Sequence, residues 1–280
     1  MEWKGRRGSG NIEDRRRMSA GRVTGIGGIG AIAVLLIGLF LGVDVSPLLQ
    51  DPGAGQGTPG ELTQADMEEG EFVSVTLADT EEIWTKVFRE QLGRSYTPAT
   101  LVLFKGVTQS PCGGASGATG PFYCPVDKKV YLDTEFFTTL DRRLGASGDF
   151  AAAYVVAHEI AHHVQDELGI LSQANAVRAR TSEAQSNAIS VQIELQADCL
   201  AGIWGRHVAQ QFGTIEPGDF EEALNAARQI GDDTLQRSAG QRPMPHTFTH
   251  GTSAQREGWF LRGLKSGNLE DCDTFSAGQL

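Results

Sequence analysis

The chain has 280 residues, enough for one large domain or two small ones with a sizeable buried core. Apolar residues make up 40% and charged residues 21%, which excludes a disordered polyelectrolyte, and four cysteines are too few for a disulfide-dense small scaffold. The net charge of −11 argues against nucleic acid as a partner, because phosphate binding needs clustered lysine and arginine. The charge is uneven. Residues 1–22 carry seven basic and three acidic side chains, net +4, which leaves −15 on the other 258 residues.

Residues 23–43 form an uncharged apolar stretch, VTGIGGIGAIAVLLIGLFLGV, whose 21 residues are long enough to cross a membrane as one helix. Basic residues precede it and acidic residues follow it, so the positive-inside rule predicts a cytoplasmic tail at 1–22 and an extracytoplasmic remainder. A cleaved signal peptide and a buried core helix are the alternatives. No clear small-x-small cleavage site follows the stretch, and a core helix would rarely lie between a basic tail and a Gly/Pro-rich linker. We therefore predict a single-pass cell-membrane protein with a flexible, Gly/Pro-rich linker at 44–70 and a soluble domain at 71–280.

The predicted elements of the domain run from a small sheet to a series of helices. The first helix is capped at Asp79 or Thr80 and ended by Gly93. Strands at 100–105 and 129–132 flank the Gly-rich loop 113–120. Helical patterns follow at 133–144, 149–168, 172–212 with a break, 219–230 and 253–264. This order predicts a helix-rich α+β fold with a small sheet before the helices.

The cysteines indicate disulfides. Cys112 and Cys124 bracket the Gly-rich loop, and Cys199 and Cys272 are the remaining two. On the oxidising side of a membrane, one obviously local pair in an even set favours the pairing Cys112–Cys124 and Cys199–Cys272 among the three that four cysteines allow. A four-cysteine zinc site is the alternative, but the sequence has no C-x-x-C spacing.

The sequence VVAHEIAHHVQ at 155–165 carries the strongest chemical signal. His158 and His162 are four residues apart, so they lie on one face of a helix within reach of one metal ion. Glu159 lies beside the open coordination position, where it can accept a proton from a water molecule activated by the metal. Val156, Ile160 and Val164 repeat at four-residue spacing and predict a buried opposite face. The alternative is a solvated helix face that merely carries two histidines.

A second helical pattern, IELQADCLAG, follows 32 residues after His162. A catalytic zinc site needs a third protein ligand, and Glu194 can supply a carboxylate oxygen. Asp198, one turn later, can accept the free ring N–H of a ligating histidine, most plausibly His158. An ordinary solvated acidic pair is the alternative, but carboxylates flanked by apolar residues are costly to bury unless they are paired or metal-bound.

HEIAH followed by ELQAD resembles the gluzincin pattern of thermolysin-like enzymes, and more closely the neutral zinc metallopeptidase family of bacteria, the YpfJ type. Four pieces carry the resemblance: GPFYCPVDKKVYLD, AAAYVVAHEIAHHVQ, IELQADCLAGIW and HTFTHGTSAQREGWFLRG. The resemblance implies a zincin-like fold with Zn²⁺ bound by His158, His162 and Glu194, and with Glu159 as the catalytic residue.

A peptidase also needs a group that stabilises the oxyanion of the reaction. We take His250 as the candidate to act beside Glu159, with His246, Tyr154 and Arg256 as alternatives. The remaining histidines, His163 and His207, are expected to be packed or at the surface. An edge strand could bind the substrate in extended form, and by analogy with the fold class Val130–Asp133 is the candidate, although an interior strand is equally compatible with the sequence.

The sequence thus predicts a membrane-anchored, extracytoplasmic zinc metallopeptidase that acts on peptides or proteins. Two alternatives stay open: a metal-stabilised binding or scaffold protein without turnover, and a helical adhesin or stalk without a metal.

Overall fold

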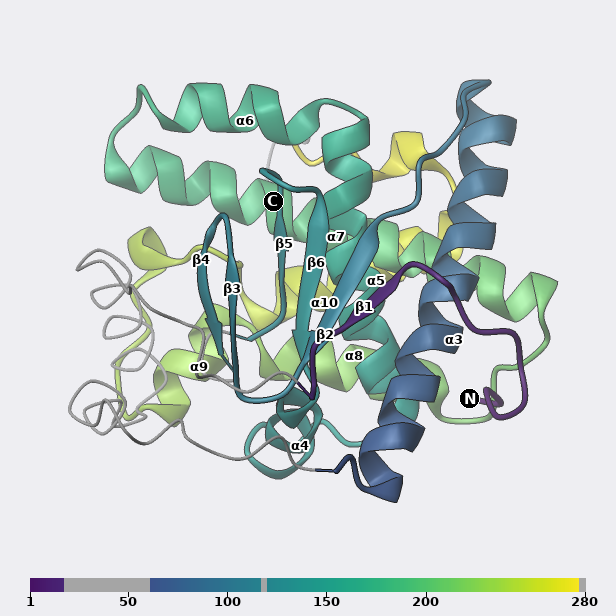
Figure 1. The fold of residues 1–280 in the computed structure, drawn as a ribbon. Coiled ribbons are helices and arrows are strands. Elements are labelled where there is room, and N and C mark those ends of the chain that lie inside the picture. Colours follow the sequence, from purple (N-terminus) through teal and green to yellow (C-terminus); the bar gives the residue numbers. More distant parts are fainter. Residues whose placement is uncertain (18–60, 117–119, 277–280) are drawn as a thin grey trace.

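The computed structural model describes residues 1–17, 61–116 and 120–276. Its first layer is a four-stranded sheet with the order β1-β2-β6-β5 (Figure 1). β1 (Ile12–Asp14), β2 (Thr100–Phe104) and β6 (Lys129–Asp133) are parallel, and β5 (Phe122–Cys124) pairs antiparallel with β6. β6 is therefore an interior strand. The expectation that Val130–Asp133 forms an edge is wrong, because β5 covers that side of β6.

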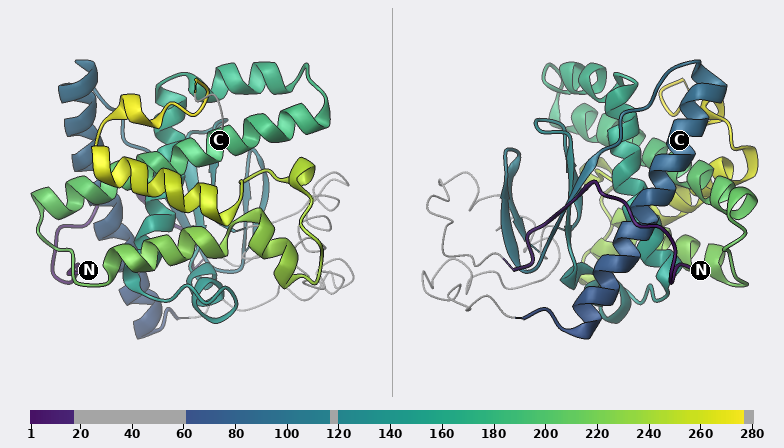
Figure 2. Two further views of the ribbon diagram at one scale, coloured as in Figure 1. Left: turned by 180° about the vertical axis from the view of Figure 1, so that it is seen from behind. Right: turned by 45° about the vertical axis from the view of Figure 1, so that its right-hand side comes forward.

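Alternation along the strands explains the two layers that pack on the sheet. Leu101, Leu103, Val130 and Leu132 face the helices and belong to the main core. Val102, Phe104 and Tyr131 face the other way and form a second, small core with Ala115 of the antiparallel hairpin β3 (Val107–Ser110) and β4 (Gly113–Ser116). The right-hand view of Figure 2 shows the hairpin on one side of the sheet and the helices on the other.

The helical layer follows the predicted order, but its first helix begins at Gln64 and not after the predicted cap at Asp79 or Thr80, and the short helix at Asp232–Ser238 was not predicted. It contains α3 (Gln64–Val87) with its π-helical end η2 (Phe88–Leu92), α4 (Glu135–Arg142), α5 (Asp149–Glu167), α6 (Ile170–Arg178), α7 (Glu183–Gln211), α8 (Asp219–Gln229), α9 (Asp232–Ser238), η3 (Pro245–Thr247), α10 (Ser253–Ser266) and η4 (Leu269–Cys272). The break predicted within 172–212 lies between α6 and α7. A helix-rich α+β fold with small sheets is thus confirmed.

The boundary at residue 71 is wrong because α3 begins seven residues earlier. Thr63 caps the helix: its hydroxyl accepts from the backbone N–H of Asp66, whose carboxylate accepts from the backbone N–H of Thr63. The same carboxylate lies 2.8 Å from Nζ of Lys105, which follows β2. Residues 64–70 therefore belong to a helix of the domain rather than to a linker.

Residues 1–17, named here the N-terminal strap, also belong to the domain. β1 pairs with β2 in the register Ile12↔Leu101, the Trp3 ring packs edge-on against Phe72, and the Arg6 guanidinium binds both oxygens of Asp79. For residues 1–17, these contacts correct the prediction of a tail that is separate from the domain.

The predicted transmembrane segment 23–43 lies outside the described residues. Among the ranges that the structure describes, no helix is both long and apolar enough to cross a membrane.

Helices α7 and α10 cross at a contact that only glycine allows. A Cβ atom on Gly202 would lie 2.1 Å from the carbonyl oxygen of Phe260, and one on Gly263 would lie 1.8 Å from that of Cys199. Both distances are far inside van der Waals contact, so any larger residue would push the helices apart. The close crossing brings Arg256 of α10 against Asp198 of α7, directly behind the candidate site.

Candidate metal centre

Helix α5 presents His158 and His162 side by side. Their ring centroids are 4.9 Å apart with the ring planes at 87°, as one helical turn between them requires. On the opposite face Val156, Ile160 and Val164 are at most 1% exposed, so the helix is anchored by its core side. The histidines are 7% and 12% exposed, which leaves the edge that they share accessible to a small ion.

Helix α7 brings Glu194 to the same point. Its Oε2 lies 3.1 Å from Nε2 of His158, and its Oε1 lies 3.6 Å from Nε2 of His162. The ligand atoms of these three residues all lie within 4.8 Å of one another. Two imidazole nitrogens and one carboxylate are a donor set that zinc accepts, and three protein ligands are typical of catalytic zinc sites. The residues present therefore fit a zinc ion.

A buried ion pair backs His158. Nδ1 of His158 lies 2.9 Å from Oδ1 of Asp198, a charge contact without the alignment of a good hydrogen bond. The Arg256 guanidinium donates from Nε to Oδ2 (2.8 Å) and from Nη2 to Oδ1 (2.9 Å) of the same carboxylate, and the Tyr154 hydroxyl donates to Oδ1. Burial raises the pKa of Asp198, but the charges of Arg256 and His158 and the polar contacts with these two side chains together lower it below its ordinary value, so the carboxyl stays ionised.

Tyr154 and Arg256 are therefore poor candidates for stabilising an oxyanion. Their side chains are 0% and 2% exposed, and their polar atoms are engaged with Asp198 behind the metal ligands. The structure gives them the role of holding Asp198 against His158.

A residue that the sequence analysis did not single out backs His162. The side chain of Gln165, 0% exposed, lies with Oε1 2.8 Å from Nδ1 of His162. The spacing already contained the signal, because residues three apart share a helix face. Both histidines therefore have a polar partner at Nδ1 and point Nε2 toward Glu194.

Glu159 follows His158 directly and is 8% exposed. Burial raises the pKa of its carboxyl, while the nearby charges of His162 and His158 act in the opposite direction. The Glu159 carboxylate is therefore poorly hydrated and close to the donor set, where it can accept a proton from a reacting water.

His250 lies in the loop before α10, held by a second residue that the sequence analysis missed. Asp232, at the start of α9 and 0% exposed, accepts hydrogen bonds from the backbone N–H groups of Thr249, His250 and Gly251. Nδ1 of His250 lies 3.1 Å from Oδ1 of Asp232. No short-range pattern links residues 18 positions apart, so this contact could not be predicted from the sequence.

The other histidines lie away from this donor set. His246 is exposed in η3, and its backbone carbonyl accepts from the Asn187 side chain. His163 is 2% exposed and lies between the Tyr123 hydroxyl and the Thr97 carbonyl. His207 is half-buried near the end of α7. The expectation that His163 and His207 are packed or surface residues agrees with these positions.

All four cysteines form disulfides, with the pairing favoured from the sequence. Cys112–Cys124 ties the turn of the β3–β4 hairpin to β5, and Cys199–Cys272 ties η4 to α7 one turn beyond Glu194. A four-cysteine zinc site is therefore excluded.

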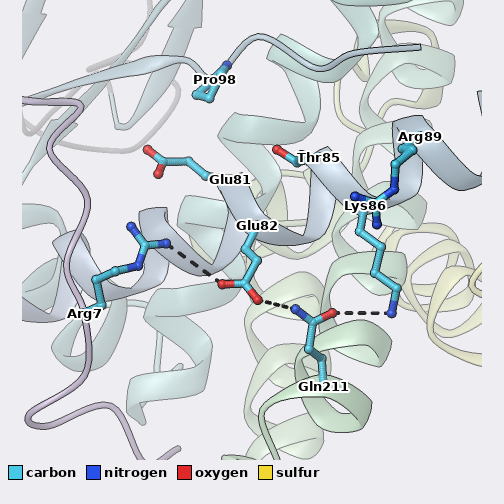
Figure 3. A pocket seen from close by; sticks show the side chains of 8 residues that line it. All are labelled: Arg7, Glu81, Glu82, Thr85, Lys86, Arg89, Pro98 and Gln211. Carbon is cyan, nitrogen blue, oxygen red and sulfur yellow. Dashed lines mark hydrogen bonds and ion pairs between the residues drawn. The ribbon is translucent and has the colours of Figure 1, made fainter. Parts of the chain in front are cut away.

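A surface hollow of about 460 Å³ lies on α3, at the strap and the end of α7 (Figure 3). Four of its polar side chains are linked in a row: Glu82 contacts Arg7 and accepts from Gln211, and Gln211 also accepts from Lys86. None of the predicted site residues lines this hollow, and we assign no chemistry to it.

Comparison with known proteins identifies a family of zinc metallopeptidases, in agreement with the donor set described above. A family model described as "Putative neutral zinc metallopeptidase" matches residues 1–275. The chain is 44% identical to the "Uncharacterized protein YpfJ" of Escherichia coli K12 over 285 residues, covering 98% of this chain and 99% of the relative. It is 45% identical to the "Uncharacterized protein Rv2575" of Mycobacterium tuberculosis H37Rv over 195 residues, 66% of this chain and 65% of that protein. No solved structure gives a significant match.

Proposed function

The chain belongs to the neutral zinc metallopeptidase family, and from that premise we propose that it is a zinc-dependent peptidase with a zincin-like active site. One observation carries the proposal: Nε2 of His158 and Nε2 of His162 both face the carboxylate of Glu194, while the Nδ1 atoms face Asp198 and Gln165. A zinc site requires ligating nitrogens that converge on one point and polar partners at the other ring nitrogens that fix the orientation of each ring.

His158, His162 and Glu194 would hold the zinc ion. Zinc bound in such a site polarises the peptide carbonyl and activates water at neutral pH. Asp198 and Gln165 orient the two rings from behind. Glu159 accepts the proton of the attacking water and delivers it to the leaving amine, since its carboxylate is poorly hydrated and close enough to His162 and His158 to interact with their charges.

His250 is our candidate for stabilising the oxyanion. Its ring is 45% exposed, so it can reach a substrate, and the fully buried carboxylate of Asp232 fixes it. With Nδ1 directed at Asp232, Nε2 is the nitrogen left to donate a hydrogen bond to developing negative charge.

The substrate class that follows is a peptide or an unfolded protein segment. Among the described residues, β5 and β1 are the two edges of the sheet, and β5, the neighbour of β6, replaces β6 as the candidate for binding a substrate strand by main-chain hydrogen bonds. We further propose an oxidising, extracytoplasmic location, since all four cysteines are in disulfides. Attachment to a membrane through residues 23–43 stays a prediction.

The test compares the wild-type protein with Glu159→Gln. We expect the wild type to bind one zinc ion and to cleave an unfolded protein such as reduced casein, with cleavage abolished by a chelator. The Glu159→Gln variant should bind zinc as tightly as the wild type. It should hydrolyse the substrate about 10²- to 10⁴-fold more slowly, because it has lost the proton acceptor. Equal turnover of the two proteins would contradict the role of Glu159. Zinc binding without any cleavage would favour the scaffold alternative.

A further inference from the structure

Gln165 lies at the centre of a buried hydrogen-bond chain that ends at His162. Its Nε2 donates to the backbone carbonyl of Ile193 (2.8 Å) and to Oε1 of Gln196 (3.0 Å), and its Oε1 faces Nδ1 of His162 (2.8 Å). Gln165 is 0% and Gln196 6% exposed, so water does not compete for these contacts. Every polar atom of the Gln165 side chain is therefore used.

The hydrogen bonds of this buried chain can run in only one direction. The carbonyl oxygen of Ile193 can only accept, so the amide nitrogen of Gln165 must face it and the amide oxygen must face His162. An amide oxygen also only accepts, so Nδ1 of His162 must carry the hydrogen. Of the two neutral tautomers of imidazole, this one leaves the lone pair on Nε2, the nitrogen that faces Glu194.

Gln196 fixes the orientation of Gln165 from the far side. Its Nε2 donates to the carbonyl oxygen of Cys272 (3.0 Å), which turns its Oε1 toward Gln165. That carbonyl belongs to η4, and the disulfide between Cys272 and Cys199 ties η4 to α7, three residues after Gln196. The chain thus starts at a covalently tethered acceptor and ends at a candidate ligand.

We propose that Gln165 is a positioning residue for the metal site: it holds His162 in the Nδ1–H tautomer, with Gln196 and the tethered Cys272 carbonyl setting the direction. The proposal rests on the proposed function in so far as His162 is a zinc ligand. The arrangement differs from that at His158, which the carboxylate of Asp198 backs. Partners behind metal-bound histidines are worth about 10- to 100-fold in metal affinity.

The test uses three methionine substitutions, since methionine matches the length of glutamine without its hydrogen bonds. Gln165→Met removes the acceptor of His162, and Gln196→Met removes only the residue that orients Gln165. Gln192→Met is the matched control, because Gln192 also lies on α7 and donates to the C-terminal segment, at the Thr274 carbonyl, without joining the chain.

Two measurements are made on the full chain. Nitrogen-15 NMR of labelled histidine at pH 8 reports which ring nitrogen of His162 carries hydrogen in the metal-free protein, and competition with a chelator gives the affinity for Zn²⁺. We expect Nδ1–H in the wild type and in Gln192→Met. In Gln165→Met we expect the hydrogen to move to Nε2 and the zinc affinity to fall about 10- to 100-fold, with a smaller change of the same kind in Gln196→Met.

Several results would overturn the proposal. One is a wild-type His162 that carries its hydrogen on Nε2. Another is that the His162 tautomer and the zinc affinity stay unchanged in both Gln165→Met and Gln196→Met. A third is a loss of zinc affinity in Gln192→Met as large as that in Gln196→Met. If Gln165→Met does not fold, Gln196→Met decides alone. A wild-type protein that binds no zinc would contradict the proposed function itself, whereas normal zinc binding that Gln165→Met leaves unchanged would contradict only the role of Gln165.

Discussion

The ring nitrogen Nδ1 of His250 lies 3.1 Å from the carboxylate oxygen Oδ1 of Asp232, a residue with no exposed surface. Partial burial lowers the pKa of His250, but the hydrogen bond to Asp232 and the charges of Glu194 and Asp232 outweigh it. The pKa therefore lies above the ordinary value of 6.5. Arg256 acts in the opposite direction but does not reverse the shift.

This shift predicts the pH dependence of hydrolysis. If protonated His250 donates to the oxyanion, activity is retained below its pKa and lost as pH rises through it. Asp232→Asn removes an anion that stabilises the protonated ring, so the alkaline limb of kcat/KM should move to lower pH. His250→Ala should abolish this limb and lower kcat about 10²- to 10³-fold while zinc binding persists. Identical pH profiles for wild type and Asp232→Asn would contradict this role.

The two disulfides are predicted to differ in their contribution to stability. Cys199 and Cys272 are 73 residues apart and Cys112 and Cys124 are 12 apart, and a longer loop loses more entropy when it is closed. The loop-closure relation gives about 4 kcal/mol for the first pair and about 3 kcal/mol for the second. Urea unfolding of the two double alanine variants measures the difference. A larger loss for the Cys112–Cys124 variant would contradict the order.

The packing of the N-terminal strap is tested by two neighbouring arginines. Arg6 binds both oxygens of Asp79, whose side chain is 5% exposed, whereas Arg7 is 66% exposed and lies 4.0 Å from Glu82. Arg6→Met leaves a buried carboxylate without its partner and should lower the free energy of unfolding by about 1–3 kcal/mol. Arg7→Met should change it by less than about 0.5 kcal/mol. Equal effects in urea unfolding would mean that the strap does not pack as described.

The sequence predicted the parts of the site that depend on local spacing. His158 and His162, and likewise Glu194 and Asp198, are four residues apart, and a helix converts that spacing into one face. The order of the helices could be predicted from local apolar periodicity. The disulfide pairing could be predicted because one cysteine pair is close in sequence and only two cysteines remain. The convergence of α5 and α7 on one point was inferred from the chemistry that zinc needs rather than from the spacing.

Contacts between distant segments were not accessible in this way. β1 has three residues and no alternation that marks a strand, so its pairing with β2 gave no signal. The linker predicted at 44–70 from its Gly/Pro-rich composition included residues 64–70, although the capping pattern from Thr63 to Asp66 marks the true start of α3. Asp232 reaches His250 only because α9 folds back against the loop before α10. Hydrophobic periodicity does not encode such contacts.

The central claim is that His158, His162 and Glu194 hold one zinc ion. Crystals of the protein grown with zinc, measured on both sides of the zinc absorption edge, test it most directly. We predict a single strong anomalous peak about 2.0–2.2 Å from Nε2 of each histidine and from a carboxylate oxygen of Glu194. A zinc peak bound elsewhere, or an absence of zinc between these three side chains, would contradict the account.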